Sequence, residues 1–148
     1  MKRILVAIAL MGTAICYANA KESEWLTDFP QAVAQAKAEH KMILLDFTGS
    51  DWCPACIAFR KGVLDSHKFQ TYAAKSVVVM EVDFPDKAPQ TDAVKKANDD
   101  LQKKFDVEGF PTFVVLNEDG KEIGRQSGYD NSGPKAFIAK LEKFKAGS

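Results

Sequence analysis

Residues 50–56 read Ser-Asp-Trp-Cys-Pro-Ala-Cys and place two cysteines, Cys53 and Cys56, three positions apart. An apolar run, residues 42–47, precedes this segment, and residues 57–61 continue it as a helix. We therefore expect a buried strand, a short loop and a helix that begins at Cys53. Unpaired backbone N–H groups and the helix dipole favour an anion there, and they lower a thiol pKa from about 8.5 to roughly 3.5–7.5. Cys53 is thus the candidate nucleophile, and Cys56, on the same helical face, is the candidate resolving thiol.

The first twenty residues have the pattern of a cleaved signal peptide. Two basic residues precede an apolar run, residues 4–15, which is too short to span a bilayer, and Ala-Asn-Ala at 18–20 fits a cleavage site. The bulky residue before Cys16 does not fit a lipid-attachment signal. We therefore expect residues 1–20 to be removed and residues 21–148 to form one periplasmic or secreted domain.

The charge balance and the cysteine count limit the possible partners of the domain. The full chain has 20 basic and 20 acidic side chains, so cleavage near Ala20, which removes two basic ones, leaves a net charge of −2. This balance does not indicate a nucleic acid or an anionic membrane as a partner, and no later stretch is long and apolar enough to insert into a membrane. Cys53 and Cys56 are the cysteines that remain. A bridge across so short a loop removes little chain entropy, which favours a redox use over a structural one.

The rest of the chain alternates helical and strand patterns. Hydrophobic periodicity and turn residues predict helices over 25–40, 53–64, 68–75, 91–105 and from Pro134 onward, and strands over 42–47, 77–83, 112–116 and 121–126. Helices between the early strands favour parallel crossovers, and the turn at residues 117–120 predicts a closing antiparallel hairpin. The sequence therefore predicts an α/β domain with a central mixed sheet flanked by helices.

Two motifs in this order closely resemble the thioredoxin superfamily: Trp-Cys-x-x-Cys after the first long strand, and Gly-Phe-Pro-Thr at residues 109–112 before the hairpin. The resemblance covers about residues 42–144, and residues 25–41 resemble the extra N-terminal helix of secreted thioredoxin-like domains. The Asp-Trp-Cys-x-Ala-Cys pattern is similar to the periplasmic C-terminal domain of the transmembrane disulfide reductase. The resemblance implies a thioredoxin-like fold and a thiol–disulfide oxidoreductase whose redox-active disulfide joins Cys53 and Cys56, with no cofactor. It also implies protein or peptide disulfides as substrates and an upstream dithiol donor such as a membrane reductase.

The resemblance also implies a substrate surface beside the cysteines. Trp52 would flank them, although a tryptophan at this place fits a core position equally well. Pro111 matches the family's cis-proline, which would turn the backbone of Phe110 toward a bound extended segment. The alternative for Pro111 is an ordinary proline at the entry to a strand.

Asp46 is a carboxylate inside the apolar strand, where burial would raise its pKa and make it a proton acceptor for Cys56. The family has a buried acid in this strand, but here one extra residue separates it from the cysteines. The loop at residues 48–51 must absorb that residue for Asp46 to lie beneath Cys56. The family's companion lysine has no counterpart in residues 77–82, and Asp51 is expected to be an exposed loop charge or an aid to the helix terminus.

Metal binding and the direction of the reaction are the remaining questions. A structural zinc site needs about four protein ligands, whereas this chain has one cysteine pair, and His40 and His67 lack ligand spacing, so we expect no metal. Pro54 and Ala55 add no charge between the cysteines, where strongly oxidising members of the family carry a histidine. This favours a reductant, and two alternatives stay open: an oxidase or isomerase, and a peptide-binding module with a structural disulfide.

Overall fold

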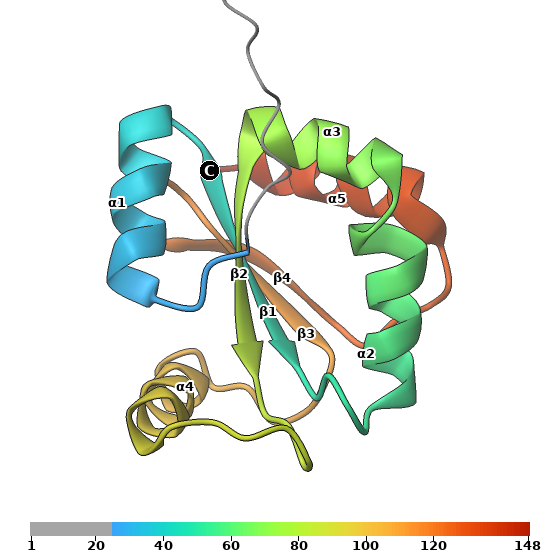
Figure 1. Ribbon diagram of the computed structural model, residues 1–148. Helices are drawn as coiled ribbons and strands as arrows, with labels where there is room; N and C mark the ends of the chain where they lie inside the picture. Colours follow the sequence, from blue (N-terminus) through green and yellow to red (C-terminus); the bar gives the residue numbers. More distant parts are fainter. Residues whose placement is uncertain (1–24) are drawn as a thin grey trace, which may run out of the picture.

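The computed structural model describes residues 25–148, so the expected signal peptide, residues 1–20, lies outside the described residues. The elements follow one another as α1 (Phe29–Glu39), β1 (Met42–Thr48), α2 (Pro54–Phe59), the π-helical turn η1 (Arg60–Leu64), α3 (His67–Ser76), β2 (Val77–Asp83), α4 (Asp92–Lys104), β3 (Thr112–Leu116), β4 (Glu122–Ser127) and α5 (Gly133–Ala146) (Figure 1). A search of these described residues for a helix long and apolar enough to cross a membrane finds none.

The four strands form one mixed sheet in the order β2-β1-β3-β4. The β1–β2 pair is parallel, and the β3–β4 hairpin is antiparallel as predicted. The expectation of parallel early crossovers is wrong for β3, which runs antiparallel to β1. Figure 1 shows the reason: α4 lies at the end of the sheet where β2 finishes and does not run back along it. The next strand therefore starts from that same end.

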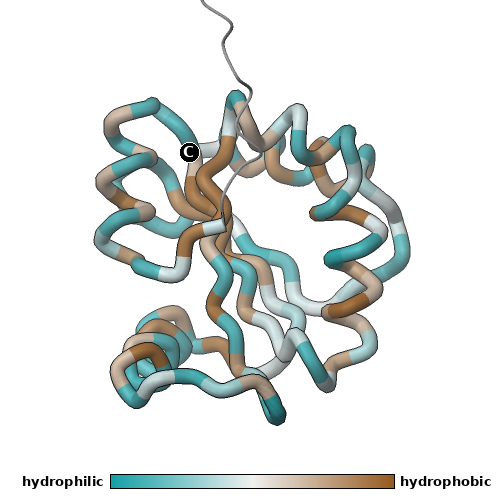
Figure 2. The backbone as a smooth tube through the Cα atoms, viewed as in Figure 1, coloured by the Kyte–Doolittle hydropathy of each residue, from teal (hydrophilic) through white to brown (hydrophobic). Residues whose placement is uncertain are grey.

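Helices cover both faces of the sheet and bury two hydrophobic clusters. The α1–α4 face includes Ile43, Leu45 and Phe47 of β1, and the face covered by α2, α3 and α5 includes Met42 and Leu44. Successive strand residues point to opposite faces, so a strand between two helical layers reads as a continuous apolar run. All seven residues of β1 are buried, and Figure 2 shows the hydrophobic colour concentrated along the central strands.

The predicted helix over residues 25–40 is shorter than expected, because it begins at Phe29. Asp28 caps it by accepting a backbone N–H hydrogen bond of 2.8 Å, and Pro30 lies in its first turn. Leu26 instead pairs with the edge strand β2 through two backbone hydrogen bonds of 3.0 and 2.8 Å. The segment before the cap thus extends the sheet and is not helical.

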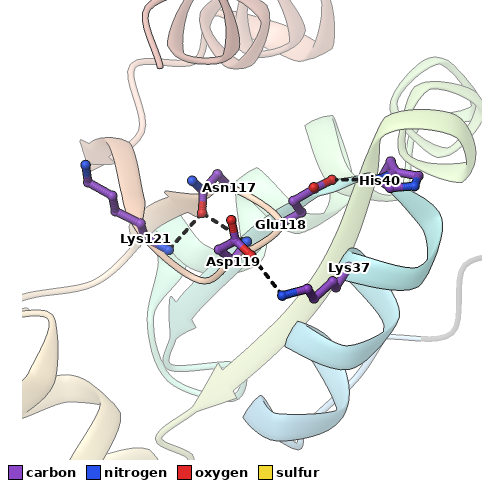
Figure 3. Close-up of polar contacts among 6 residues, drawn as sticks. All are labelled: Lys37, His40, Asn117, Glu118, Asp119 and Lys121. Carbon is purple, nitrogen blue, oxygen red and sulfur yellow. Dashed lines mark hydrogen bonds and ion pairs between the residues drawn. The ribbon is translucent and has the colours of Figure 1, made fainter.

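The β3–β4 turn is attached to the end of α1 (Figure 3). It lies at the end of the sheet where β1 begins, because Leu116 pairs with Ile43. Lys37 contacts Asp119 at 3.1 Å, and His40 Nδ1 lies 3.0 Å from Glu118. The Asn117 side chain closes the turn by accepting two backbone N–H hydrogen bonds. Exposed ion pairs stabilise a fold by only about 0–1 kcal/mol each. These contacts therefore orient the hairpin more than they stabilise the domain.

Gly124 of β4 lies directly against the Phe144 ring of α5, and an added Cβ would come within 2.3 Å of that ring. Gly124→Ala should therefore lower the free energy of unfolding by about 1–3 kcal/mol, because the edge strand or the helix must move. Urea denaturation measures this change. Gly147→Ala is the control, since its Cβ would meet no atom nearer than 3.6 Å. Equal stability of Gly124→Ala and the wild type would contradict the expectation.

Candidate active site

Cys53 and Cys56 form a disulfide across the first turn of α2, with their Cα atoms 5.2 Å apart. Cys53 is the N-cap residue, and Pro54 occupies the first turn, where a helix leaves backbone N–H groups without partners. The Cys53 Sγ accepts a hydrogen bond of 3.2 Å from the backbone N–H of Cys56. A sulfur at the positive end of the helix dipole, with a donor already directed at it, has the environment that stabilises a thiolate.

Solvent exposure does not distinguish the two sulfurs in this disulfide form. Cys53 is 5% exposed and Cys56 is 4% exposed. The difference between them is position: Cys53 caps the helix, whereas Cys56 lies within it. The assignment of Cys53 as the nucleophile therefore rests on the helix terminus and stays a prediction.

The loop between β1 and α2 places Trp52 on the surface beside the cysteines. The indole packs on Gly49 so closely that a Cβ there would lie 2.4 Å from the ring, which only glycine permits. Trp52 is 48% exposed and is the one exposed large hydrophobic side chain among residues 25–148. Its Nε1–H donates a 2.7 Å hydrogen bond to the carbonyl of Phe84. Of the two positions left open for Trp52, the structure shows the surface one.

Three aromatic side chains form a continuous group next to the disulfide. The rings of Trp52 and Phe110 meet edge to face at 6.1 Å, and Phe110 stacks on Phe84 at 5.0 Å. The bond between Phe110 and Pro111 is cis, and the Pro111 carbonyl accepts a 2.8 Å hydrogen bond from the Gly128 N–H. The structure thus brings Trp52 and Phe110 into contact and places Pro111, which is buried, next to Phe110 in the chain, while their part in substrate binding stays a prediction.

The sequence analysis did not identify Phe84 as a residue of this site, although its position after strand β2 could have indicated it. Phe84 follows the carboxyl end of β2, as the cysteine loop follows the carboxyl end of β1, and parallel neighbours bring these ends to one edge of the sheet. Beyond Pro111, a cavity of about 470 Å³ lies between residues 106–112 and the end of β4, where Arg125 and Gly128 line it. Phe110 therefore contacts the aromatic group and also lines this cavity.

Asp51 fixes the loop that carries Phe84. Its carboxylate accepts three backbone N–H hydrogen bonds of 2.8–2.9 Å from residues 86–88, and these bonds lower its pKa. Next to it, Ser50 donates its N–H and its hydroxyl to Asp83 at 2.9 and 2.6 Å. Asp51 is therefore a loop charge, the first of the two expected alternatives, and it has a structural role that the sequence did not predict. Both hydrogen-bond sets join the loops after β1 and β2.

Asp46 is buried, 4% exposed, as its place in the apolar run predicts. Alternation along β1 puts it on the same face as Met42 and Leu44, the face covered by α2, so the extra loop residue does not turn it away from that helix. Burial, followed by the charge of Glu81, raises its pKa, the Arg60 guanidinium opposes the rise, and the net value is about 8. A carboxyl with such a pKa holds a proton at neutral pH, and its role in proton transfer stays a prediction.

Two more carboxylates occupy this face, and sequence reasoning missed them as site residues. In the parallel register, Glu81 lies opposite Asp46 and Asp83 lies opposite Thr48. Burial raises the pKa of Glu81, and Arg60 opposes that rise. On this face, each strand begins with apolar side chains and has an acidic side chain nearer its carboxyl end. This pattern at every second residue can be read from the sequence of each strand. Across residues 25–148, no three such groups are placed to hold a metal ion.

Asp46→Asn should stabilise the protein by an amount that grows with pH. The folded chain holds the Asp46 proton up to about pH 8, whereas an ordinary aspartate releases it near 3.8. Between these values folding takes up a proton, so the free energy of unfolding falls as pH rises, by at most ~1.4 kcal/mol per pH unit. Asparagine does not titrate, so the free energy of unfolding of Asp46→Asn lacks this pH dependence. Denaturant titrations of both proteins from pH 4 to 9 should show a difference that grows to about pH 8 and then stays level.

Asp51→Asn provides the contrast for this experiment, because hydrogen bonds lower the Asp51 pKa. It should reduce stability at neutral pH, and its deficit should disappear as the pH falls through the range where the folded carboxylate takes up its proton. A pH-independent difference for Asp46→Asn would mean that Asp46 titrates normally in the folded chain.

Comparisons with known proteins identify the family of this chain. Residues 29–145 match the family described as a thioredoxin-like domain. The chain is 35% identical to the disulfide bond reductase DsbH of Chlamydia pneumoniae, over 77% of this chain and 68% of that protein. It is 32% identical to the thiol:disulfide interchange protein DsbD of Klebsiella pneumoniae, over 82% of this chain but only 18% of that longer protein. The solved structure of a DsbH oxidoreductase superimposes with a TM-score of 0.77 and 31% identity, covering 94% of each chain. This chain therefore belongs to the thioredoxin-like domain family, and within it to the thiol–disulfide oxidoreductases.

Proposed function

We propose that this chain is a periplasmic or secreted disulfide reductase whose Cys53–Cys56 dithiol reduces disulfides in protein or peptide substrates. The observation that carries the proposal is the position of Cys53 as the N-cap of α2, where its sulfur accepts the Cys56 N–H at 3.2 Å. A reduced pair in this geometry has a stabilised thiolate to attack and a second thiol one turn away to resolve. The similarity to DsbH, which is named a disulfide bond reductase, supports the same direction.

The forward reaction transfers two electrons from the dithiol to the substrate. The Cys53 thiolate attacks one substrate sulfur, a mixed disulfide forms, and the other substrate sulfur leaves as a thiolate. Cys56 then gives its proton to the Asp46 carboxylate and attacks Cys53 Sγ, which expels the second substrate thiolate. The substrate thiolates take protons from solvent, and the enzyme is left as a disulfide with Asp46 protonated.

Re-reduction runs the same steps backwards. An upstream dithiol attacks the disulfide at Cys53, Cys56 leaves as a thiolate, and the Asp46 carboxyl returns the proton to it. The second thiol of the donor then attacks the donor sulfur bound to Cys53, which releases the Cys53 thiolate and leaves the donor as a disulfide. A pKa of about 8 suits this step, because the disulfide form then holds the proton at neutral pH. We infer that the donor is a membrane reductase, because the chain resembles a segment of the longer DsbD protein.

The substrate contacts the enzyme through Trp52, Phe110 and Pro111, with Phe84 extending the same surface. The rings of Trp52, Phe110 and Phe84 are in contact, and Trp52 is already exposed. An extended substrate chain pairs with the backbone at Phe110 as a short strand while its sulfur meets Cys53. Apolar residues beside the substrate cysteine would then cover the aromatic surface.

The reduction potential tests the direction of the reaction. Pro54 and Ala55 give the thiolate no added charge, so the potential should lie nearer the value of about −270 mV typical of thioredoxin than the value of about −120 mV of a strong oxidant. Equilibration with glutathione buffers measures it, and the protein should accelerate insulin reduction by dithiothreitol. A potential at the oxidising end would make it an oxidase or isomerase. Failure to accelerate insulin reduction would favour a peptide-binding module with a structural disulfide.

Cysteine variants test the roles of the two sulfurs. Cys56→Ser should accumulate mixed disulfides with substrate proteins, because attack by Cys53 remains and resolution is lost. Cys53→Ser is the matched control and should accumulate few. Non-reducing gels of protein from secreting cells measure both. Trapping by Cys53→Ser alone would reverse the assignment.

A further inference from the structure

An ion pair joins the end of the cysteine helix to strand β2. Arg60, the first residue of η1, contacts the Glu81 carboxylate, and its guanidinium stacks over the Trp25 ring at 3.9 Å. The backbone N–H of Arg60 bonds to the carbonyl of Cys56, so its position is tied to the resolving cysteine. Asp65 approaches Arg60 at 3.7 Å from the more exposed side. The Arg60–Glu81 pair is partly buried, with side chains 38% and 21% exposed, so solvent screens its charges less than on an open surface.

The same Glu81 is the neighbour of Asp46 in the sheet. Parallel register places Asp46 opposite Glu81, and alternation puts Glu81 and Asp83 on the face that Asp46 occupies. Asp83 is engaged by the Ser50 hydroxyl and N–H, and the β3 neighbour of Asp46 is the apolar Phe113. The charged groups that act on Asp46 are therefore Glu81 and Asp83 from β2, and Arg60 from η1.

We propose that Arg60 and Glu81 are positioning residues for Asp46: their ion pair holds a positive and a negative charge beside that carboxyl, and these charges control its proton exchange. The inference deepens the proposed function, because its kinetic consequence depends on Asp46 serving Cys56. Glu81 and Arg60 touch no substrate in this scheme and act through Asp46.

The physical basis is a balance of opposite charges. Glu81 disfavours a second negative charge on Asp46, whereas Arg60 favours it, so the two charges act in opposite directions. A carboxyl in a low-dielectric site responds strongly to a nearby charge, so loss of one partner exposes the full effect of the other. An uncompensated Arg60 would make Asp46 release its proton at lower pH. Neutralising both residues would remove both effects and bring Asp46 back toward its original behaviour.

This balance gives a double-mutant test on the oxidised protein. Glu81→Gln should lower the titration midpoint of the Asp46 carboxyl carbon, followed by ¹³C NMR, by about one pH unit, which is a tenfold loss of proton affinity. Glu81→Gln combined with Arg60→Gln should move the midpoint back toward the wild-type value. An unchanged midpoint in Glu81→Gln, or an equally low midpoint in the double variant, would overturn the proposal.

Two further variants control for structural effects. Glu122→Gln breaks the Glu122–Arg125 pair on β4, in which the arginine side chain is also 38% exposed, and should leave the Asp46 midpoint unchanged. Arg60→Lys keeps the charge and should also keep the midpoint, which preserves the test if the double variant does not fold. A shift in Arg60→Lys as large as that in Glu81→Gln would contradict a role for charge.

The rate of mixed-disulfide resolution separates this inference from the proposed function. Its pH midpoint should follow the Asp46 midpoint across the variants, because Cys56 delivers its proton to that carboxyl. The NMR titration needs no turnover. If wild type fails to reduce insulin but the carboxyl shifts occur, the proposed function is refuted and the control of Asp46 by the ion pair stands.

Discussion

The parallel pairing of β1 with β2 is the constraint on which the site depends. Its register brings the carboxyl ends of both strands to one edge of the sheet, so the cysteine loop after β1 meets the Phe84 loop after β2. The same register sets Asp46 opposite Glu81 on the face that α2 covers. A shift of the pairing by one residue would turn every side chain of a strand to the opposite face. It would separate Asp46 from Glu81, so the charges around Asp46 and the contact between the two loops both depend on this register.

Hydrogen bonds between the two loops convert this proximity into a fixed geometry. Asp51 binds three successive backbone N–H groups, Asp83 binds Ser50 twice, and the Trp52 indole donates to the Phe84 carbonyl. A charged acceptor with several backbone donors forms the stronger class of protein hydrogen bond. The aromatic group of Trp52, Phe110 and Phe84 is thus held in place, and in the proposed contact with substrate this order reduces the entropy lost on binding.

Local sequence signals predicted most of the fold and the centre of the site. The two cysteines, the buried Asp46 and the strand that carries it follow from motif, periodicity and burial, which are properties of adjacent residues. The direction of β3 does not, because it depends on where α4 packs relative to the sheet. The role of Asp51 depends on a loop 35 residues away, and the Arg60–Glu81 contact joins residues 21 positions apart. Such contacts depend on the register of the paired strands, and this register cannot be read from a single sequence.

The buried Asp46 carboxyl connects the charges on this face of the sheet with the proposed thiol chemistry. A group that passes a proton to and from a thiol in every cycle works best when its pKa lies near the ambient pH. An exposed aspartate ionises near 3.8 and would rarely hold that proton, whereas burial raises the Asp46 pKa to about 8. Burial without a nearby cation would raise the pKa further. Arg60, whose backbone N–H bonds to the Cys56 carbonyl, opposes that rise, and in the proposed cycle this favours proton exchange between the Asp46 carboxyl and Cys56.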